Sequence, residues 1–87
     1  MIMVLNDTFV DNVVFLRKHY TVSQRAMAKL IGMSYLTYRD YEEKRIRPDL
    51  PPEPYHRLCQ VLGIDGNTLY HFELWKHPEL IKPCREI

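Results

Sequence analysis

Two serines and a glycine near the middle of the chain constrain its fold more than any other feature. Ser23 is suited to cap a helix, because its hydroxyl can accept a hydrogen bond from a free backbone N–H of the first turn. Gly32 can end that helix, since glycine enters the left-handed conformation without steric cost. Ser34 can then cap another helix. The segment therefore predicts two short helices, at residues 24–31 and 35–43, joined by a tight turn.

An amphipathic segment precedes these two helices. Asp7 or Thr8 can cap a helix that runs to about His19. The apolar spacing predicts its inward positions, which are Phe9, Val13, Val14 and Leu16. In the helix at 35–43 the expected inward positions are Thr37, Tyr38 and Tyr41.

Two more helices are expected after a proline-rich connector. Pro52 or Pro54 can open a helix that stops at Gly63, since proline suits the first helical turn. Asp65 can cap a fifth helix at about 66–75, which the His77-Pro78 pair ends. The pattern predicts an all-α fold of five short helices. We divide the chain into a possible N-terminal arm (1–7), a helical domain (8–75) and a C-terminal tail (76–87).

This pattern resembles the lambda-repressor-like (Xre-type) helix-turn-helix family over roughly residues 9–70. The shared signs are Ser23-Gln24, Ala28, Gly32-Met33-Ser34 and Tyr41-Glu42, with basic residues and Pro48 following. The resemblance implies a DNA-binding domain at 8–75 whose helix at 35–43 enters the major groove of duplex DNA.

The resemblance also implies which residues contact the DNA. The base-reading positions are Tyr35, Leu36, Arg39 and Asp40. The phosphate-binding positions are Gln24, Arg25, Lys29, Lys44, Arg45 and Arg47. Tyr35 and Leu36 depart from the polar residues usual in the family. Leu36 can pack on a thymine methyl group and Asp40 can accept from cytosine, although Asp40 can instead pair with Lys44 four residues on.

The charge is unevenly distributed along the chain. Residues 17–47 hold eight basic and three acidic side chains, a net charge of +5, although the whole chain carries only +1. A basic face on a nearly neutral protein is typical of phosphate contact, although an ordinary solvated face can have the same composition.

Two further sets of residues have structural interpretations. By resemblance to the family, Arg17 and Glu42 are expected to form an ion pair that orients the third helix against the first. Leu69, Phe72 and Trp75 form an apolar stripe, which we interpret as a homodimer interface. The alternative is that Trp75 closes the core of its own chain.

The sequence offers no motif for catalysis or for cofactor binding. His19, His56, His71 and His77 lack paired metal-ligand spacing, and neither Cys59 nor Cys84 has a near partner. We expect Cys59 to be a buried free thiol. No glycine-rich phosphate loop, nucleophile motif or membrane-spanning run occurs. We therefore expect no enzyme, no metal, no cofactor and no membrane association.

The leading hypothesis is a small bacterial or phage-type transcriptional regulator, such as a repressor. It would bind double-stranded DNA as a homodimer in the cytoplasm, at the nucleoid. The alternative is an antitoxin or accessory helix-turn-helix protein whose main role is binding a partner protein. A third reading is a helix-turn-helix relic that makes only protein contacts.

Overall fold

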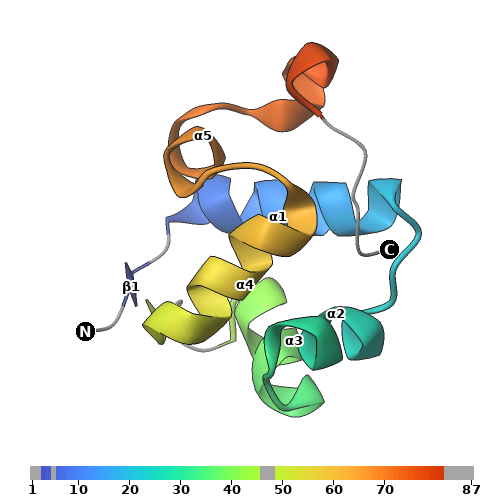
Figure 1. Ribbon diagram of the computed structural model, residues 1–87, viewed down its shortest axis with the longest axis vertical. Coiled ribbons are helices and arrows are strands. Elements are labelled where there is room, and N and C mark those ends of the chain that lie inside the picture. Colours follow the sequence, from blue (N-terminus) through green and yellow to red (C-terminus); the bar gives the residue numbers. More distant parts are fainter. Residues whose placement is uncertain (1–2, 5, 46–48, 82–87) are drawn as a thin grey trace.

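The computed structural model describes residues 3–4, 6–45 and 49–81, and this part of the chain is all-α (Figure 1). Its five α-helices are α1 (Asp7–His19), α2 (Gln24–Ile31), α3 (Tyr35–Glu42), α4 (Pro52–Leu62) and α5 (Gly66–His71). Two short 3-10 helices follow, η1 (Leu74–Lys76) and η2 (Pro78–Leu80). The described strands β1 (Met3–Val4) and β2 (Asp49–Leu50) pair antiparallel, with Met3 opposite Leu50. None of the described helices is long and apolar enough to span a membrane.

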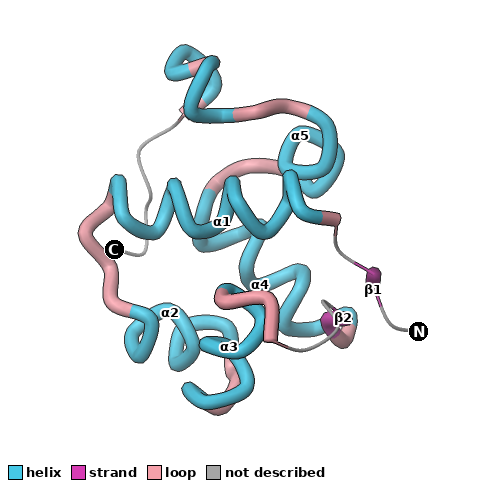
Figure 2. Tube along the Cα trace, turned by 180° about the vertical axis from the view of Figure 1, so that it is seen from behind, coloured by secondary structure: helices cyan, strands magenta, loops and turns pink. Residues whose placement is uncertain are grey.

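Helix α1 crosses the middle of the molecule. In both views α2 and α3 lie at one end of the long axis, and α5 with the 3-10 helices lies at the other (Figures 1 and 2). Helix α1 contacts α3 on one side and α5 and η1 on the other, while α4 packs against α2. The arrangement makes α1 the element that joins the two ends of the fold.

The serine–glycine–serine prediction is confirmed at each position. The Ser23 hydroxyl accepts from the Ala26 N–H at 3.0 Å, and the Ser34 hydroxyl accepts from the Thr37 N–H at 3.2 Å. Gly32 lies between them with a φ of 78°, in the left-handed region that favours glycine. Local backbone chemistry therefore determines where α2 ends and α3 begins.

Two local predictions are wrong. The cap of α1 is Asn6 rather than Asp7 or Thr8, because the Asn6 side-chain oxygen accepts from the Phe9 N–H at 2.8 Å. Thr37 is exposed rather than inward, because its hydroxyl bonds to the Ser34 hydroxyl at the surface of the first turn.

Helix α5 is shorter than predicted, ending at His71 instead of about residue 75. The cause is Asn12 of α1, which is fully buried. Its amide nitrogen donates to the Leu69 and Phe72 carbonyls at 2.7 and 2.6 Å, and its oxygen accepts from the Leu74 N–H at 3.0 Å. These bonds occupy backbone groups where the helix would continue, and the chain turns into η1.

The core draws on almost every element. Its fully buried members include Phe9, Leu16, Met27, Leu58 and Leu74.

The structure adds residues to the folded unit at both ends of the predicted helical domain. Strand β1 lies in the predicted arm, yet it pairs with β2 of the domain, and Leu80 and Ile81 of the predicted tail pack against the core. The folded unit therefore includes β1 at one end of the described chain and Leu80 and Ile81 at the other.

Candidate nucleic-acid interface

The inner face of α3 is fixed by the predicted ion pair of Arg17 and Glu42. The Arg17 Nε and Nη2 atoms donate to the two Glu42 carboxylate oxygens at 2.7 and 3.0 Å, a two-point contact. Arg17 Nη1 also donates to the Val22 carbonyl at 2.8 Å. Burial opposes the charge of Arg17, but Glu42 outweighs this effect, and the pKa of Arg17 is raised. The pair joins α1, the loop before α2, and α3.

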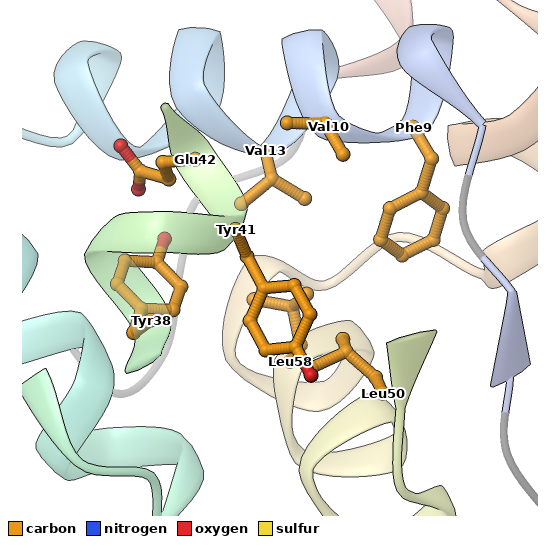
Figure 3. A pocket seen from close by; sticks show the side chains of 8 residues that line it. All are labelled: Phe9, Val10, Val13, Tyr38, Tyr41, Glu42, Leu50 and Leu58. Atoms are coloured by element: carbon orange, nitrogen blue, oxygen red, sulfur yellow. The ribbon is translucent and has the colours of Figure 1, made fainter. Parts of the chain in front are cut away.

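Tyr38 lies beside this pair, with only 3% of its surface exposed. Its hydroxyl has no hydrogen-bond partner within the described chain. Burial, and then the charge of Glu42, raise the pKa of Tyr38 far above its usual value, so the phenol stays neutral. Tyr38 also lines a cavity of about 20 Å³, room for one water molecule, between α1, α3, α4 and β2 (Figure 3).

The outer face of α3 carries a cation–π stack. The Arg25 guanidinium of α2 lies 4.2 Å from the centre of the Tyr35 ring, and that of Arg39 lies 5.9 Å from it. Leu36, the next residue, is 58% exposed. Two positive charges, one from α2 and one from the last turn of α3, therefore lie close to the Tyr35 ring, beside the exposed side chain of Leu36.

The predicted base-reading residues divide into two groups. Tyr35, Leu36 and Arg39 belong to the outer face just described. Asp40 accepts from the Arg39 Nη2 atom at 3.3 Å, so its carboxylate already has a cationic partner. The alternative pairing of Asp40 with Lys44 is wrong, because Lys44 contacts Asp11 instead.

The predicted phosphate-binding residues are also divided. Arg25 and Lys29 are exposed on α2, and Arg45 is exposed but lies 3.0 Å from Glu43. The Gln24 side chain donates to Glu42 at 3.1 Å, so this half-buried residue joins the Arg17–Glu42 network. Arg47 lies outside the described residues.

Lys44 forms an ion pair within the chain. Its ammonium lies 3.0 Å from the Asp11 carboxylate and 3.8 Å from that of Asp7, and these acids raise its pKa. The phosphate-binding role of Lys44 stays a prediction, and two carboxylates lie near its charge. The three residues tie the end of α3 to the first turns of α1.

The predicted dimer stripe is partly wrong. Leu69 is fully buried inside the chain, so it cannot form a surface contact. Phe72 and Trp75 are 44% and 40% exposed, but they follow the end of α5 instead of continuing one helical stripe. Trp75 borders an open groove with Phe15 and Lys18 of α1. The exposed apolar surface at this end is therefore Phe72 and Trp75.

Metal binding would need several titratable side chains grouped together in the described part of the chain. Within residues 3–4, 6–45 and 49–81, no group of three or more His, Cys, Asp and Glu side chains could hold a metal ion. Cys59 is free and half-buried, and burial raises the pKa of its thiol to about 11. Cys84 lies outside the described residues.

Sequence reasoning missed the part played by Asn12. A single asparagine inside an amphipathic helix has no spacing that reveals a partner, because the groups it binds are backbone atoms of residues far along the chain. Its one visible signal is its place beside the inward residues Phe9, Val13 and Leu16.

A search against family models, curated proteins and solved structures finds no match to this chain.

Proposed function

We propose that the chain is a small helix-turn-helix regulator that binds double-stranded DNA through the outer face of α2 and α3. It would insert the N-terminal half of α3 into the major groove and act at the nucleoid. The resemblance of residues 23–42 to the lambda-repressor-like family supports this function, and so do the charge and anchoring of α3.

One observation carries the proposal. Helix α3 is held from its inner side by Arg17, Glu42 and Tyr38, while its outer side presents Arg39 and, from α2, Arg25. Anchoring on one side and positive charge on the other suit a helix that enters a groove lined by phosphates. Lys29 adds an exposed positive charge on α2.

Salt dependence tests the proposal. If Arg25, Lys29, Arg39 and Arg45 each neutralise one phosphate, the log–log slope of affinity against salt concentration is about −4 per protomer. The variant Lys29→Ala should reduce the size of that slope by about one unit on every sequence. A matched control is Lys76→Ala, because Lys76 pairs with Glu73 at the opposite end of the fold. A slope near zero contradicts the proposal.

The exposed residues Phe72 and Trp75 support association with a second copy of the chain. A two-fold dimer would present two copies of α3 to the DNA and so double the length of the site read. The surface is small, and we propose it without Leu69. Sedimentation of wild type and Trp75→Ala at several concentrations checks this, with monomeric wild type as the contrary result.

The same exposed aromatic pair favours the second candidate, an antitoxin or accessory protein that binds a partner protein. Replacing Trp75 distinguishes the two candidates, because the substitution removes a different interaction in each case. For a DNA-binding homodimer, Trp75→Ala weakens DNA binding by the purified chain. For an accessory protein, DNA binding by the purified chain is unchanged and a stoichiometric partner is lost on co-purification.

A further inference from the structure

The positive charges that border α2 differ from most others in the described chain. The arginines and lysines that face a carboxylate at 3.3 Å or less are Arg17, Arg39, Lys44, Arg45 and Lys76. Those with no carboxylate partner within the described residues are Lys18, Arg25, Lys29 and Arg57. Arg25 and Lys29 belong to α2, and Arg57 belongs to α4, which packs against α2. Unpaired positive charge is therefore concentrated around one helix.

Arg57 is exposed, but the fold holds its guanidinium in place. The Arg57 Nε atom donates to the Leu30 carbonyl at 2.9 Å, near the C-terminal end of α2. This bond leaves the two terminal nitrogen atoms of Arg57 without a partner in the described chain. They are available for a two-point contact with a carboxylate. The side chain is thus already oriented toward an anionic group from outside.

An open groove between α2 and α4 lies beside this guanidinium. Its apolar lining residues are Val22, Ala26 and Leu30, and its charged lining residues are Lys29 and Arg57. No acidic side chain of the described chain lines it. The groove therefore combines apolar surface with two positive charges that the chain itself leaves unpaired.

This combination of surfaces distinguishes among possible occupants. A sugar–phosphate backbone supplies negative charge but has no side chain to fill an apolar groove. In a second copy of this chain, the exposed rings of Phe72 and Trp75 adjoin Glu73, but that carboxylate is already paired with Lys76. An acidic protein segment that also carries an apolar side chain satisfies both features, because its carboxylates can meet the cations while the apolar group covers Ala26 and Leu30.

We propose that the groove between α2 and α4 is a docking site for a short acidic segment of a partner protein, anchored by an apolar side chain. The groove lies at the α2 end of the fold, opposite the 3-10 helices (Figures 1 and 2). The proposal goes beyond DNA binding and does not depend on it. Lys29 is shared with the proposed DNA surface, whereas Arg57 belongs to the groove alone, so Arg57 separates the two roles.

The probe is a displayed library of short random peptides, selected on the full chain. The selected peptides should combine acidic residues with an apolar residue. One of them, synthesised with a fluorescent label, should bind Arg57→Gln about ten-fold more weakly than wild type, the effect of losing hydrogen bonds to a charged group. The matched control is Lys76→Gln, at the other end of the fold, which should bind the peptide as wild type does.

A second pair of variants tests the groove itself without endangering the fold. Ala26 is exposed, and its N–H donates to the capping hydroxyl of Ser23, so a glutamate or glutamine at this position can complete a capping box. Ala26→Glu adds negative charge to the groove and should abolish peptide binding. Ala26→Gln, similar in size but neutral, should weaken binding much less. Circular dichroism should show both variants folded.

Three results would overturn the proposal. The first is that the library yields no peptide, or only peptides without acidic residues. The second is that a selected peptide binds Arg57→Gln and Ala26→Glu as tightly as wild type. The third is that Arg57→Gln reduces the salt dependence of duplex DNA binding, which would make Arg57 a phosphate contact instead. DNA binding by wild type is measured separately, so the proposed function can fail or stand independently of these results.

Discussion

Helix α1 holds the two ends of the molecule by two different kinds of contact. Among the described residues, the polar or charged ones that are buried as whole residues are Asn12 and Arg17, and both belong to α1. Arg17 holds α3 through the carboxylate of Glu42, a side chain. Asn12 holds the segment after α5 through two carbonyls and one N–H of the backbone.

The difference concerns what each contact requires of the sequence. The ion pair needs one particular residue on each helix, and losing either leaves a buried charge. The Asn12 contacts need only one particular residue, because every position supplies backbone groups. The first contact fixes a helix by its side-chain identity, whereas the second fixes the path of the chain whatever its side chains are.

The largest expected effect comes from breaking the ion pair. Glu42→Ala should lower the free energy of unfolding by about 3–5 kcal/mol, because Arg17 would remain buried without its partner. The side chains of Arg17 and Glu42 are only 10% and 4% exposed, so solvent screening is weak. Denaturant unfolding measures the change, with Glu43→Ala as the exposed control.

A double-mutant cycle sharpens this result. The variant lacking both Arg17 and Glu42 should be less destabilised than the sum of the two single changes, because neither charge is then left alone. A coupling energy of zero would mean that the two residues act independently and that the comparison with Asn12 has no basis.

The next largest effect comes from removing the Asn12 amide. Asn12→Ala should cost about 3 kcal/mol, since three hydrogen bonds to backbone groups are worth about 1 kcal/mol each. The loss should be local to the far end of the fold. Hydrogen exchange should accelerate over residues 69–76 more than in α2 and α3, because α1 would no longer hold that segment.

Asn67→Ala is the control for Asn12, since Asn67 is exposed on α5. It should leave both stability and exchange nearly unchanged. Uniform acceleration of exchange throughout Asn12→Ala would show that the two ends unfold as one unit and that α1 does not hold them separately.

The sequence predicts the end of the molecule formed by α2 and α3 far better than the end formed by α5 and η1. Ser23, Gly32 and Ser34 act on their own backbone, so their positions alone reveal the boundaries of α2 and α3. The Arg17–Glu42 pair is foreseen by resemblance to a family. The end of α5 is not, because it depends on a contact across about sixty residues that leaves no periodic trace.

The sequence also predicts only part of the candidate nucleic-acid interface. Tyr35, Leu36 and Arg39 lie on one outer face, as helical spacing requires. Gln24 and Lys44 each contact an acidic neighbour that the sequence does not reveal: Glu42 accepts from Gln24, and Asp11 pairs with Lys44. A linear sequence shows a charge but not the opposite charge that folding places beside it.

The smallest expected effect concerns Lys44, a third tie to α1 that lies at the surface. Its φ of 58° is in the left-handed region, which costs a residue with a Cβ atom about 1 kcal/mol. Its exposed pairing with Asp11 returns about 0.5 kcal/mol. Lys44→Gly should therefore leave stability unchanged or raise it by up to about 0.5 kcal/mol in thermal unfolding. A clear loss of stability would mean that the Lys44–Asp11 pair stabilises the fold as the buried contacts do.

The anchoring of α3 from one side has a consequence for how such a chain can change. Tyr38 and Glu42 secure the helix, while Leu36 and Thr37 are exposed and contribute little to the core. Substitutions at the exposed positions alter surface chemistry without disturbing the fold, as surface changes usually do. New binding preferences can thus arise by single steps that each leave a stable protein, and a library that varies only those positions should consist largely of folded members.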